Sequence, residues 1–453
     1  MKLLYHKQQN GSALIISLIF MLVILVLVGS LFEFVTQNVK ATRRAVAGEQ
    51  ALALAEAGVD KAVSELNATA GAYSGETGTA LGTGVFDASV ATLSATLKEI
   101  TVTGYAPNKT NPQASRKVKV RVGINTTVVN FKYGLQVGDG GLHMKDNSQV
   151  NGNVYVNGKI DGEVGKKNTV ITGDAFSARS TGQIKDMIVN GNASAHSFNN
   201  VTVSGDAKGY SLDKGNVTGN VFANAISNCA ITGNASYTTK SSCTVGGTNT
   251  TPYPGEPDPA PESFPISDDQ INDWKNSAVS GGTITGDYDV NSSVTLGPKK
   301  ITGHLHLKNN ATLTLTGPIW AVKDIDIDKG SVVALASSYG NNSEVIISDD
   351  SIDVSKDVDF QRAGSASYIL TISTDPGGDA IKISKNGDAL VVYAPSGGVH
   401  IEKDAIVREV TGWKVNMEKD TQINYETGLA NLQFSSGPGG SWTPVRGTWR
   451  EIK

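Results

Sequence analysis

The two cysteines of the chain, Cys229 and Cys243, are the residues whose spacing most directly suggests a chemical bond. They lie fourteen residues apart, and glycines recur at the same interval around them. In a stack of coils with that period, both side chains occupy the same position on neighbouring strands, which lie about 4.8 Å apart. This distance suits the Cα atoms of a disulfide, and an exported compartment permits oxidation. We therefore predict a Cys229–Cys243 disulfide, with two reduced, packed thiols as the alternative.

Two groups of side chains have spacings that are similar to those of metal ligands. Asp324, Asp326 and Asp328 alternate with isoleucines, but a helix–loop–helix calcium site needs glycine and glutamate where Lys329 and Leu335 stand. That alternation instead predicts a strand with a solvated acidic face. His304 and His306 point the same way from another predicted strand, with no nearby cysteine or obvious third ligand. We predict no metal site and no cofactor.

One acidic cluster is the candidate for polysaccharide-cleaving chemistry. Such chemistry needs carboxylates that converge on one exposed face. The cluster consists of Asp349, Asp350, Asp353, Asp357 and Asp359, with Arg362 beside them. It lies in a polar loop–strand–loop stretch, which favours solvated surface, so we predict no catalytic residues and no enzyme. A membrane-anchored β-helix enzyme acting on polysaccharide is the alternative.

Three tryptophans lie close to the C-terminal end of the sequence. They are Trp413, Trp442 and Trp449. An open stack of strands exposes its edges and core, so we expect these rings to cap the last coil. Stacking against a sugar is the alternative role.

The stretch from Ala13 to Phe32 determines the cellular compartment in which all of these residues lie. It carries no charge and, as a helix, would be about 30 Å long, which matches the hydrocarbon core of a bilayer. We predict a transmembrane helix. Lys2, His6 and Lys7 precede it and favour a cytoplasmic N-terminus with the bulk of the chain exported. A cleaved secretory signal ending near Gly29–Ser30 is the alternative.

The helix is predicted to continue well beyond the membrane. Residues 35–66 are rich in good helix formers, and Leu52, Ala55, Val59, Ala62 and Leu66 form one apolar stripe. We expect one helix of about 55 residues, with two helices broken around Gly48 as the alternative. The alternating segments 97–106 and 116–124 predict an antiparallel hairpin packed on the stripe.

Residues 5–130 resemble the type IV pilin-like proteins, and more narrowly the PilX N-terminal-domain pilus assembly family. The resemblance rests on the basic leader, Gly11, the apolar helix, its AEAG-type continuation and the small sheet. It implies a leader over 1–11, a membrane helix over 12–34 and a pilin-like helix and hairpin over 35–130. It also implies cleavage by a prepilin peptidase between Gly11 and Ser12, with methylation of the new terminus. Ile16 replaces the glutamate of major pilins, which implies a minor or tip subunit.

Residues 131–250 contain an internal repeat. Glycines at 191, 205, 219, 233 and 247 are fourteen apart, and an aliphatic residue stands two places before each. Such units bury their aliphatic residues only by stacking, so the pattern predicts a β-solenoid (parallel β-helix). We expect glycine to serve a tight turn at positive φ. A disordered Gly/Asn linker is the alternative.

The remaining chain is predicted to repeat this architecture. Six of the fourteen prolines lie between Thr251 and Pro265, which indicates an extended linker over 251–266. A short helix is expected over 268–278 with Ser267 as its cap. A second β-solenoid-like domain with longer coils is expected over 267–453. The predicted fold is mainly β, with one long N-terminal α-helix and a small pilin-like sheet.

Together these features predict a minor or tip pilin-like component of a type IV pilus or pseudopilus, displaying a β-solenoid for spacing or adhesion. The expected partners are prepilin peptidase, other pilins, an inner-membrane assembly platform, the membrane, and a host or matrix surface. The net charge of −4 suggests no nucleic-acid partner. A simple anchored adhesin is the remaining alternative.

Overall fold

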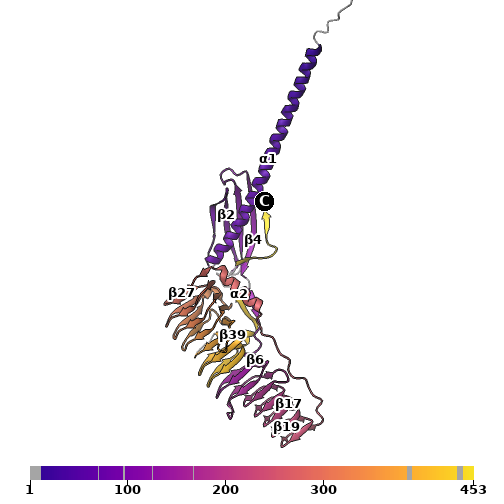
Figure 1. Cartoon of the computed structure of the whole chain (residues 1–453), viewed down its shortest axis with the longest axis vertical. Coiled ribbons are helices and arrows are strands. Elements are labelled where there is room, and N and C mark those ends of the chain that lie inside the picture. The colour runs from indigo at the N-terminus through magenta and orange to yellow at the C-terminus, as the bar shows by residue number, and fades with distance from the viewer. Residues whose placement is uncertain are drawn as a thin grey trace, which may run out of the picture.

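The computed structural model describes residues 12–69, 71–94, 97–124, 126–166, 168–384, 390–435 and 442–452. The chain is mainly β, with a long N-terminal apolar helix, a small antiparallel sheet on that helix and an elongated stack of parallel strands (Figure 1). The stack extends from the end of the sheet that lies farther from the N-terminus of the helix (Figure 1).

Helix α1 (Ser12–Ala68) runs without interruption through Gly48, so the expected single helix is confirmed. The predicted stripe faces the protein core: Ala55, Val59, Ala62 and Leu66 are fully buried. These side chains pack on the antiparallel sheet, because an apolar stripe at helical spacing needs a partner surface.

The sheet on α1 contains the predicted hairpin and further strands that were not predicted. Its strands are β1 (Gly75–Leu81), β2 (Gly84–Ser94), β3 (Leu97–Ala106), β4 (Ala114–Ile124), β44 (Trp442–Pro444) and β45 (Arg450–Ile452). β3 and β4 pair antiparallel as expected. Gly104 allows close contact with the helix, since a Cβ there would lie 2.1 Å from the carbonyl oxygen of Ala51.

The C-terminal strands belong to this sheet and not to the stack. β44 and β45 both pair with β4. The backbone N–H of Trp442 donates to Asn67 near the end of α1, at 2.6 Å. The expected range 267–453 therefore spans two parts of the molecule, because its last strands return to the N-terminal sheet.

The outer part of the stack, here called the distal coils, comprises residues 135–250. Its strands are β6 (Leu135–Met144), β7 (Gln149–Asn151), β8 (Val154–Val156), β9 (Ile160–Gly162), β10 (Val170–Ile171), β11 (Ala175–Ser177), β12 (Gln183–Lys185), β13 (Ile188–Val189), β14 (Ala193–Ser194), β15 (Ser197–Asn199), β16 (Thr202–Val203), β17 (Ala207–Asp213), β18 (Asn216–Val217), β19 (Val221–Ser227), β20 (Ala230–Ile231), β21 (Ala235–Ser236), β22 (Thr239–Ser241), β23 (Thr244–Val245) and β24 (Asn249–Thr250). Val189, Val203 and Val217 stand opposite one another in parallel register, fourteen residues apart. The predicted aliphatic positions thus form one internal column.

The repeated glycines have a different role from the expected turn at positive φ. Gly191, Gly205, Gly219 and Gly233 do not adopt a left-handed φ. A Cβ on Gly219 would lie 2.4 Å from the carbonyl oxygen of Gly205 in the preceding coil. Glycine is therefore required by the close approach of neighbouring coils.

The left-handed corner of each distal coil is occupied by other residues. Asp186, Asn200, Lys214, Asn228 and Ser242 have positive φ and are also fourteen residues apart. Asparagine and aspartate tolerate this conformation better than most residues with side chains. The tight turn was thus predicted in the right period but at the wrong position of the repeat.

The part of the stack nearest the sheet on α1, here called the proximal coils, comprises residues 283–424. Its strands are β25 (Thr283–Ile284), β26 (Tyr288–Val290), β27 (Ser293–Leu296), β28 (Lys299–Ile301), β29 (Leu305–Leu307), β30 (Thr312–Leu315), β31 (Ile319–Ala321), β32 (Ile325–Ile327), β33 (Val332–Leu335), β34 (Glu344–Ser348), β35 (Ile352–Val354), β36 (Asp359–Gln361), β37 (Ile369–Ser373), β38 (Ile381–Ile383), β39 (Leu390–Ile401), β40 (Ile406–Val407), β41 (Glu409–Met417) and β42 (Gln422–Asn424). A 3₁₀ turn, η1 (Ser337–Tyr339), precedes β34.

The two sets of coils form one continuous stack. β41, from the last proximal coil, pairs in parallel with β6, the first distal strand, and β42 pairs with β7. Side chains also bridge this junction: Lys145 binds Glu418 at 2.6 Å, and Asn151 donates to Asn424 at 2.6 Å. The chain therefore enters the stack in its middle and runs to the distal end. It then passes along the side of the stack to the proximal end and forms the proximal coils from there back to the middle (Figure 1).

Residues 253–266, here called the strap, run from the distal end along the side of the distal coils to the junction with the proximal coils. The backbone N–H of Tyr253 donates to Tyr237 at 3.1 Å, and the side chain of Gln136 donates to the carbonyl of Ser263 at 2.9 Å. Between these points the strap passes seven strands that pair in succession, in the order β21, β19, β17, β14, β11, β8 and β6. An extended proline-rich segment, with a rise of about 3.1 Å per residue, fits these strand spacings of about 4.8 Å.

The strap leads into helix α2 (Asp268–Ser280), which begins at the predicted cap. The hydroxyl of Ser267 accepts from the backbone N–H of Gln270 at 3.3 Å. Ile271 and Trp274 pack on outward-facing apolar residues of β34, β37 and β39, together with η2 (Thr427–Asn431) and β43 (Leu432–Ser435). β43 pairs with β5 (Thr126–Val129), which precedes the stack. These elements close a second core beside the proximal coils.

Candidate functional site

The N-terminal half of α1 is apolar and lies outside the folded core. From Leu14 to Val46 none of its side chains is buried, and Leu14 and Phe32 are 71% and 74% exposed. The core begins at Ala47. Among the described residues, this helix is the candidate membrane span, with a mean hydropathy of 3.1 in its most apolar window.

The hydroxyl groups of Ser17, Ser30 and Thr36 in this apolar half are satisfied inside the helix. The hydroxyls of Ser17 and Ser30 donate to the carbonyls of Leu14 and Leu27, both at 2.9 Å. Thr36 donates to Phe32 at 2.7 Å. A segment placed in hydrocarbon must satisfy its polar groups without water, so these bonds suit a membrane-spanning helix.

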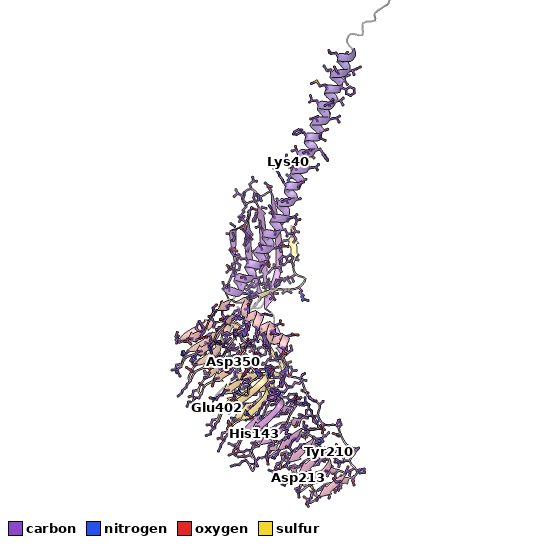
Figure 2. All side chains as sticks on the ribbon, viewed as in Figure 1. Lys40, His143, Tyr210, Asp213, Asp350 and Glu402 are labelled. Carbon is purple, nitrogen blue, oxygen red and sulfur yellow. A yellow bond between two sulfur atoms is a disulfide. The ribbon has the colours of Figure 1, made fainter. Side chains whose placement is uncertain are left out.

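Beyond its uncharged segment, α1 enters a zone that carries both charged and apolar side chains. Lys40 marks this zone in Figure 2, and Arg43 follows one turn later. Val35, Val39, Val46 and Gln113 border a hollow of about 490 Å³ beside Arg43. We call this hollow the shoulder groove. It joins the bare helix to the part that packs on the sheet.

The predicted processing site straddles the start of the described structure. Gly11 lies outside the described residues, and α1 begins at Ser12. Ile16 is 56% exposed, so its apolar side chain is available to lipid or to another helix. The predicted span from Ala13 to Phe32 falls within α1.

Cys229 and Cys243 are joined by a disulfide near the distal end of the stack. Their Cα atoms are 4.4 Å apart. The residues flanking them pair in register, Ala230 with Thr244, so the cysteines lie one coil apart. The bond links the last distal coils, where the stack has fewer neighbours.

The histidines and the acidic strand considered for metal binding pair with each other. His304 Nδ1 lies 2.5 Å from Asp324, and His306 Nε2 lies 3.0 Å from Asp328. Asp326 lies between them, and burial together with the nearby Asp324 carboxylate raises its pKa. No group of three potential ligands suited to a metal ion occurs among the residues that the structure describes. The acidic face is therefore less solvated than expected.

The acidic residues 349–359 do not converge on Arg362. Asp349 binds Lys275 of α2 at 2.5 Å, and Asp357 lies 3.9 Å from Lys329. Asp353 stands opposite Lys382 in the next coil, and burial raises its pKa. These side chains point into separate local contacts because they belong to different turns of one coil.

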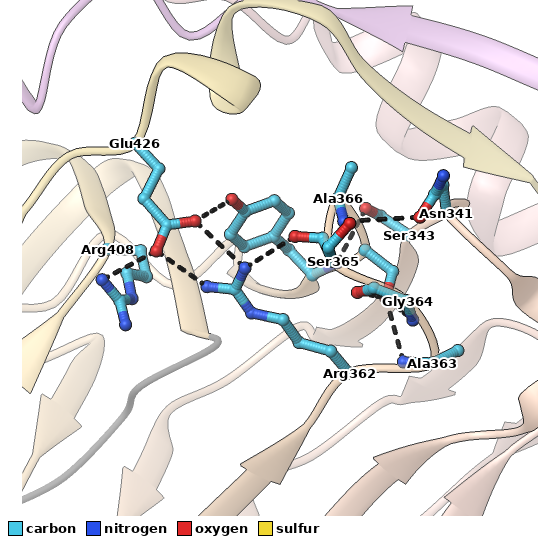
Figure 3. A network of polar contacts seen from close by, with 11 residues as sticks. Asn341, Ser343, Arg362, Ala363, Gly364, Ser365, Ala366, Arg408 and Glu426 are labelled. Carbon is cyan, nitrogen blue, oxygen red and sulfur yellow. Dashed lines mark hydrogen bonds and ion pairs between the residues drawn. The ribbon is translucent and has the colours of Figure 1, made fainter.

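Arg362 belongs instead to a network around Glu426 (Figure 3). Its guanidinium donates to Glu426 at 3.0 and 3.2 Å, and Arg408 binds the same carboxylate at 2.8 Å. Tyr368 also donates to Glu426. Burial opposes ionisation, but the hydrogen bonds from Arg362 and Tyr368 hold the pKa of Glu426 below its ordinary value. The network binds the segment after β42, which contains Glu426, to the proximal coils, which contain Arg362 and Arg408.

The three tryptophans lie in different places and do not cap a coil together. Trp442 is buried in the sheet on α1, and Trp449 lies between β44 and β45, 43% exposed. Trp413 lies on β41 at the junction of the two sets of coils, 45% exposed. Sequence proximity misled here, because the chain leaves the stack after β42.

Sequence reasoning missed two buried carboxylic acids. Glu344 begins β34 and accepts from the hydroxyl of Tyr339, and burial raises its pKa to about 8. Glu409 begins β41 beside Thr411, and burial raises its pKa well above the ordinary value. The signal available in the sequence is clearer for Glu344, which begins the mostly apolar strand β34, than for Glu409, whose strand β41 also carries Lys414 and Asn416.

No protein-family model matches the sequence, and no curated protein matches it. The resemblance to the PilX family therefore stays a prediction. Among solved structures, the competence-associated pilin ComZ from Thermus thermophilus aligns over 90% of this chain and 97% of its own, with 10% identity and a TM-score of 0.20. A TM-score this low carries no inference about this chain.

Proposed function

We propose that this chain is an exported, membrane-tethered pilin-like subunit that displays its stack of coils, a β-solenoid, outward from a type IV pilus or pseudopilus. The observation that carries the proposal is the division of α1 into two halves. One half packs on a small sheet, and the other projects as a bare apolar rod. A rod of this kind has two suitable environments, the bilayer before assembly and the packed helices of a fibre afterwards.

The shoulder groove supports helix packing between subunits. Its apolar residues Val35, Val39 and Val46 lie beyond the uncharged segment, where lipid no longer covers them. Large exposed apolar patches usually mark interaction sites. The adjacent Arg43 and Gln113 supply polar groups at its rim. An apolar helix from a neighbouring pilin fits this surface.

A minor or tip position is the form of the proposal that the molecule favours. The stack lies at the end of the sheet remote from the bare helix, so it projects beyond the helix bundle without obstructing it (Figure 1). Repeating so large a body in every subunit of a shaft would crowd the fibre. Ile16 also removes the acidic group that major pilins carry at the fifth position after the cleavage site.

We infer a non-enzymatic role for the stack. Asp349 and Asp357 of the acidic cluster engage Lys275 and Lys329, while Arg362 is engaged by Glu426. Spacing and adhesion remain the roles that this rigid body would serve. A membrane-anchored polysaccharide-active enzyme requires a convergent acid pair, and residues 349–362 do not supply one.

The proposal is tested by the N-terminus of the mature protein. We expect Edman sequencing to begin at Ser12, with an N-methylated α-amino group, and the protein to stay in the membrane or fibre fraction. Gly11→Val is the matched control, because it changes the residue before the cleavage site and should preserve Met1. A mature start near Ser30 with freely soluble protein would overturn the proposal, whereas an intact Met1 in the wild type would support a simple anchored adhesin.

The shoulder groove provides a second test. A cysteine introduced at Val39 should form a disulfide, after oxidation, with a cysteine introduced into the apolar helix of a neighbouring pilin-type subunit. Val164→Cys is the control, since Val164 is also highly exposed, at 76%, but lies on the stack. Equal cross-linking at both positions would contradict specific helix packing.

A further inference from the structure

The junction of the distal and proximal coils contains a polar hollow that the proposed helix function does not use. Its volume is about 500 Å³, within the usual range for small-ligand sites. The lining side chains include Asp139, His143, Lys159, Asp161, Lys414 and Asn416. They come from β6, from β9 and the turn before it, and from β41, so the hollow exists only because the two sets of coils join.

Three of these side chains, His143, Asp161 and Asn416, belong to a longer polar column. One outward-facing column follows the whole stack in register, through Asp289, His306, Asp326, Asp353, Lys382, His400, Asn416, His143, Asp161, Lys185, Asn199, Asp213, Ser227 and Ser241. Figure 2 marks two of its members, His143 and Asp213. On the proximal side Lys382 binds Glu402 at 2.9 Å, and on the distal side Asn199 donates to Asp213 at 3.1 Å.

At the junction the column loses these partners. Within the described residues, the side chains of Asn416, His143 and Asp161 make no hydrogen bond or ion pair with protein groups. The same holds for Lys159 and Lys414 at the edges of the hollow. Donors and acceptors thus converge on one space without satisfying one another.

An exposed tryptophan adjoins the same space. The pairing of β41 with β6 steps from Gly412↔Val137 to Lys414↔Gly141, so Trp413 has no partner in the register. Bulges of this kind redirect a side chain. A Cβ on Gly140 would lie 2.8 Å from Cε3 of Trp413, so glycine makes room for the indole beside the hollow. The ring is supported by backbone yet remains 45% exposed.

The groups that face the hollow indicate the class of ligand. Asp139 is paired with Arg179 at 3.0 Å, so Lys159, Lys414 and Asp161 are the charged groups that face the hollow, with one net positive charge. Hydrogen-bond donors and acceptors that lie side by side next to an aromatic face suit a neutral ligand that has many hydroxyls and an apolar ring face.

We propose that this junction binds a neutral oligosaccharide. One sugar ring stacks on Trp413, and neighbouring hydroxyls bond Asp161, Asn416 and the two lysines. The inference deepens the adhesive part of the proposed function. Binding at the junction and assembly through α1 are measured separately, so either can fail without the other.

The test uses the full chain in a polyoxyethylene detergent, because sugar-headed detergents would compete. The neutral probes are cellohexaose, chitohexaose and maltohexaose, compared with hexagalacturonate and a single-stranded oligonucleotide. Isothermal titration and tryptophan fluorescence measure the Kd of each. We expect at least one neutral probe to bind more tightly than both anionic probes.

The variants locate the binding. Trp413→Ala should weaken the neutral probe at least tenfold, and Asp161→Asn should weaken it several-fold. Trp449→Ala is the matched control, with a similarly exposed ring on the other part of the molecule, and should change Kd less than twofold. Unchanged thermal unfolding of each variant verifies the fold. The proposal is overturned if no neutral probe binds at millimolar concentration, if an anionic probe binds more tightly, or if Trp413→Ala binds as the wild type does.

Discussion

Single residues in this chain owe their identity to contacts between coils as often as to local conformation. The residue after each repeated glycine shows this clearly. The side-chain oxygen of Asn192 accepts from the backbone N–H of Asp206 at 3.0 Å, and that of Asp206 accepts from Asn220 at 2.7 Å. The Gly-Asn/Asp pair of each repeat is therefore a close contact followed by a bond to the next coil.

The sequence reveals the period of such residues but not the reason for it. Fourteen-residue spacing identified the aliphatic column and placed Cys229 and Cys243 on neighbouring strands. It did not distinguish a glycine required by φ from one required by proximity, because both produce the same invariant interval. That distinction depends on the distance between coils, which only the assembled stack defines.

Glu344 makes stability depend on pH. Burial raises its pKa from 4.5 to about 8, so the folded state holds a proton that the unfolded state has released between these values. The free energy of unfolding should therefore fall as the pH rises from 4.5 to about 8, by on the order of a few kcal/mol. Glu344→Gln should flatten this slope, measured as the urea midpoint between pH 5 and pH 8.

Glu426 makes the free energy of unfolding depend on pH in the opposite direction, so Glu426→Gln is the comparison variant. Its pKa is lowered in the folded state, so its contribution is present above its ordinary pKa and is lost as the pH falls. This variant should be less stable than the wild type at neutral pH and approach it in acid. An unaltered slope in Glu344→Gln would show that the carboxyl titrates normally.

At the scale of elements, the strap is the feature whose position the sequence did not disclose. Proline density predicted an extended connector, and the segment is extended. Its docking depends on single groups spread over several coils, such as Asn157, which carries no recognisable signal. The carboxamide of Asn157 donates to the carbonyl of Glu262 and accepts from its N–H, both at 2.9 Å.

Asn157→Ala should release the middle of the strap. It leaves two backbone groups without their partner, which costs about 1–3 kcal/mol when such groups are kept from water. We expect faster amide exchange at Glu262 and faster proteolysis within residues 254–263, with little change in the coils. Glu256→Ala is the control, since its pair with Lys208 is exposed and 3.6 Å long. Equal exchange rates in the two variants would show that Asn157 does not hold the strap.

At the scale of the whole molecule, the order of coils in space differs from their order in the sequence. The sequence analysis placed two solenoid-like segments on either side of a linker, and both segments are present as parallel coils. Their joining could not be predicted, because Lys145 and Glu418 are 273 residues apart and no local pattern marks them as neighbours. The same holds for the return of β44 to the sheet on α1.

This continuity predicts the behaviour of a nicked chain. A protease site inserted after Gly255, which is exposed and has open space around it, would cut the chain between the two sets of coils. We expect the two fragments to remain associated during gel filtration, because β41–β6 and β42–β7 pairing joins them. Because β44 and β45 also pair with β4, association alone does not separate the two contacts, and a variant at the junction distinguishes them. Adding Val150→Asp to the nicked chain should weaken the association, since Val150 is fully buried beside the junction.

The placement of the junction in the middle of the stack also affects how the protein can change in length. A coil inserted between β19 and β21 would move the far end outward by about 4.8 Å. The strap would need only one or two more residues to follow it, at about 3.1 Å each. Neither change touches α1, its sheet or the polar hollow. The reach of the stack can therefore be lengthened or shortened in fourteen-residue steps while α1, its sheet and the junction stay unchanged.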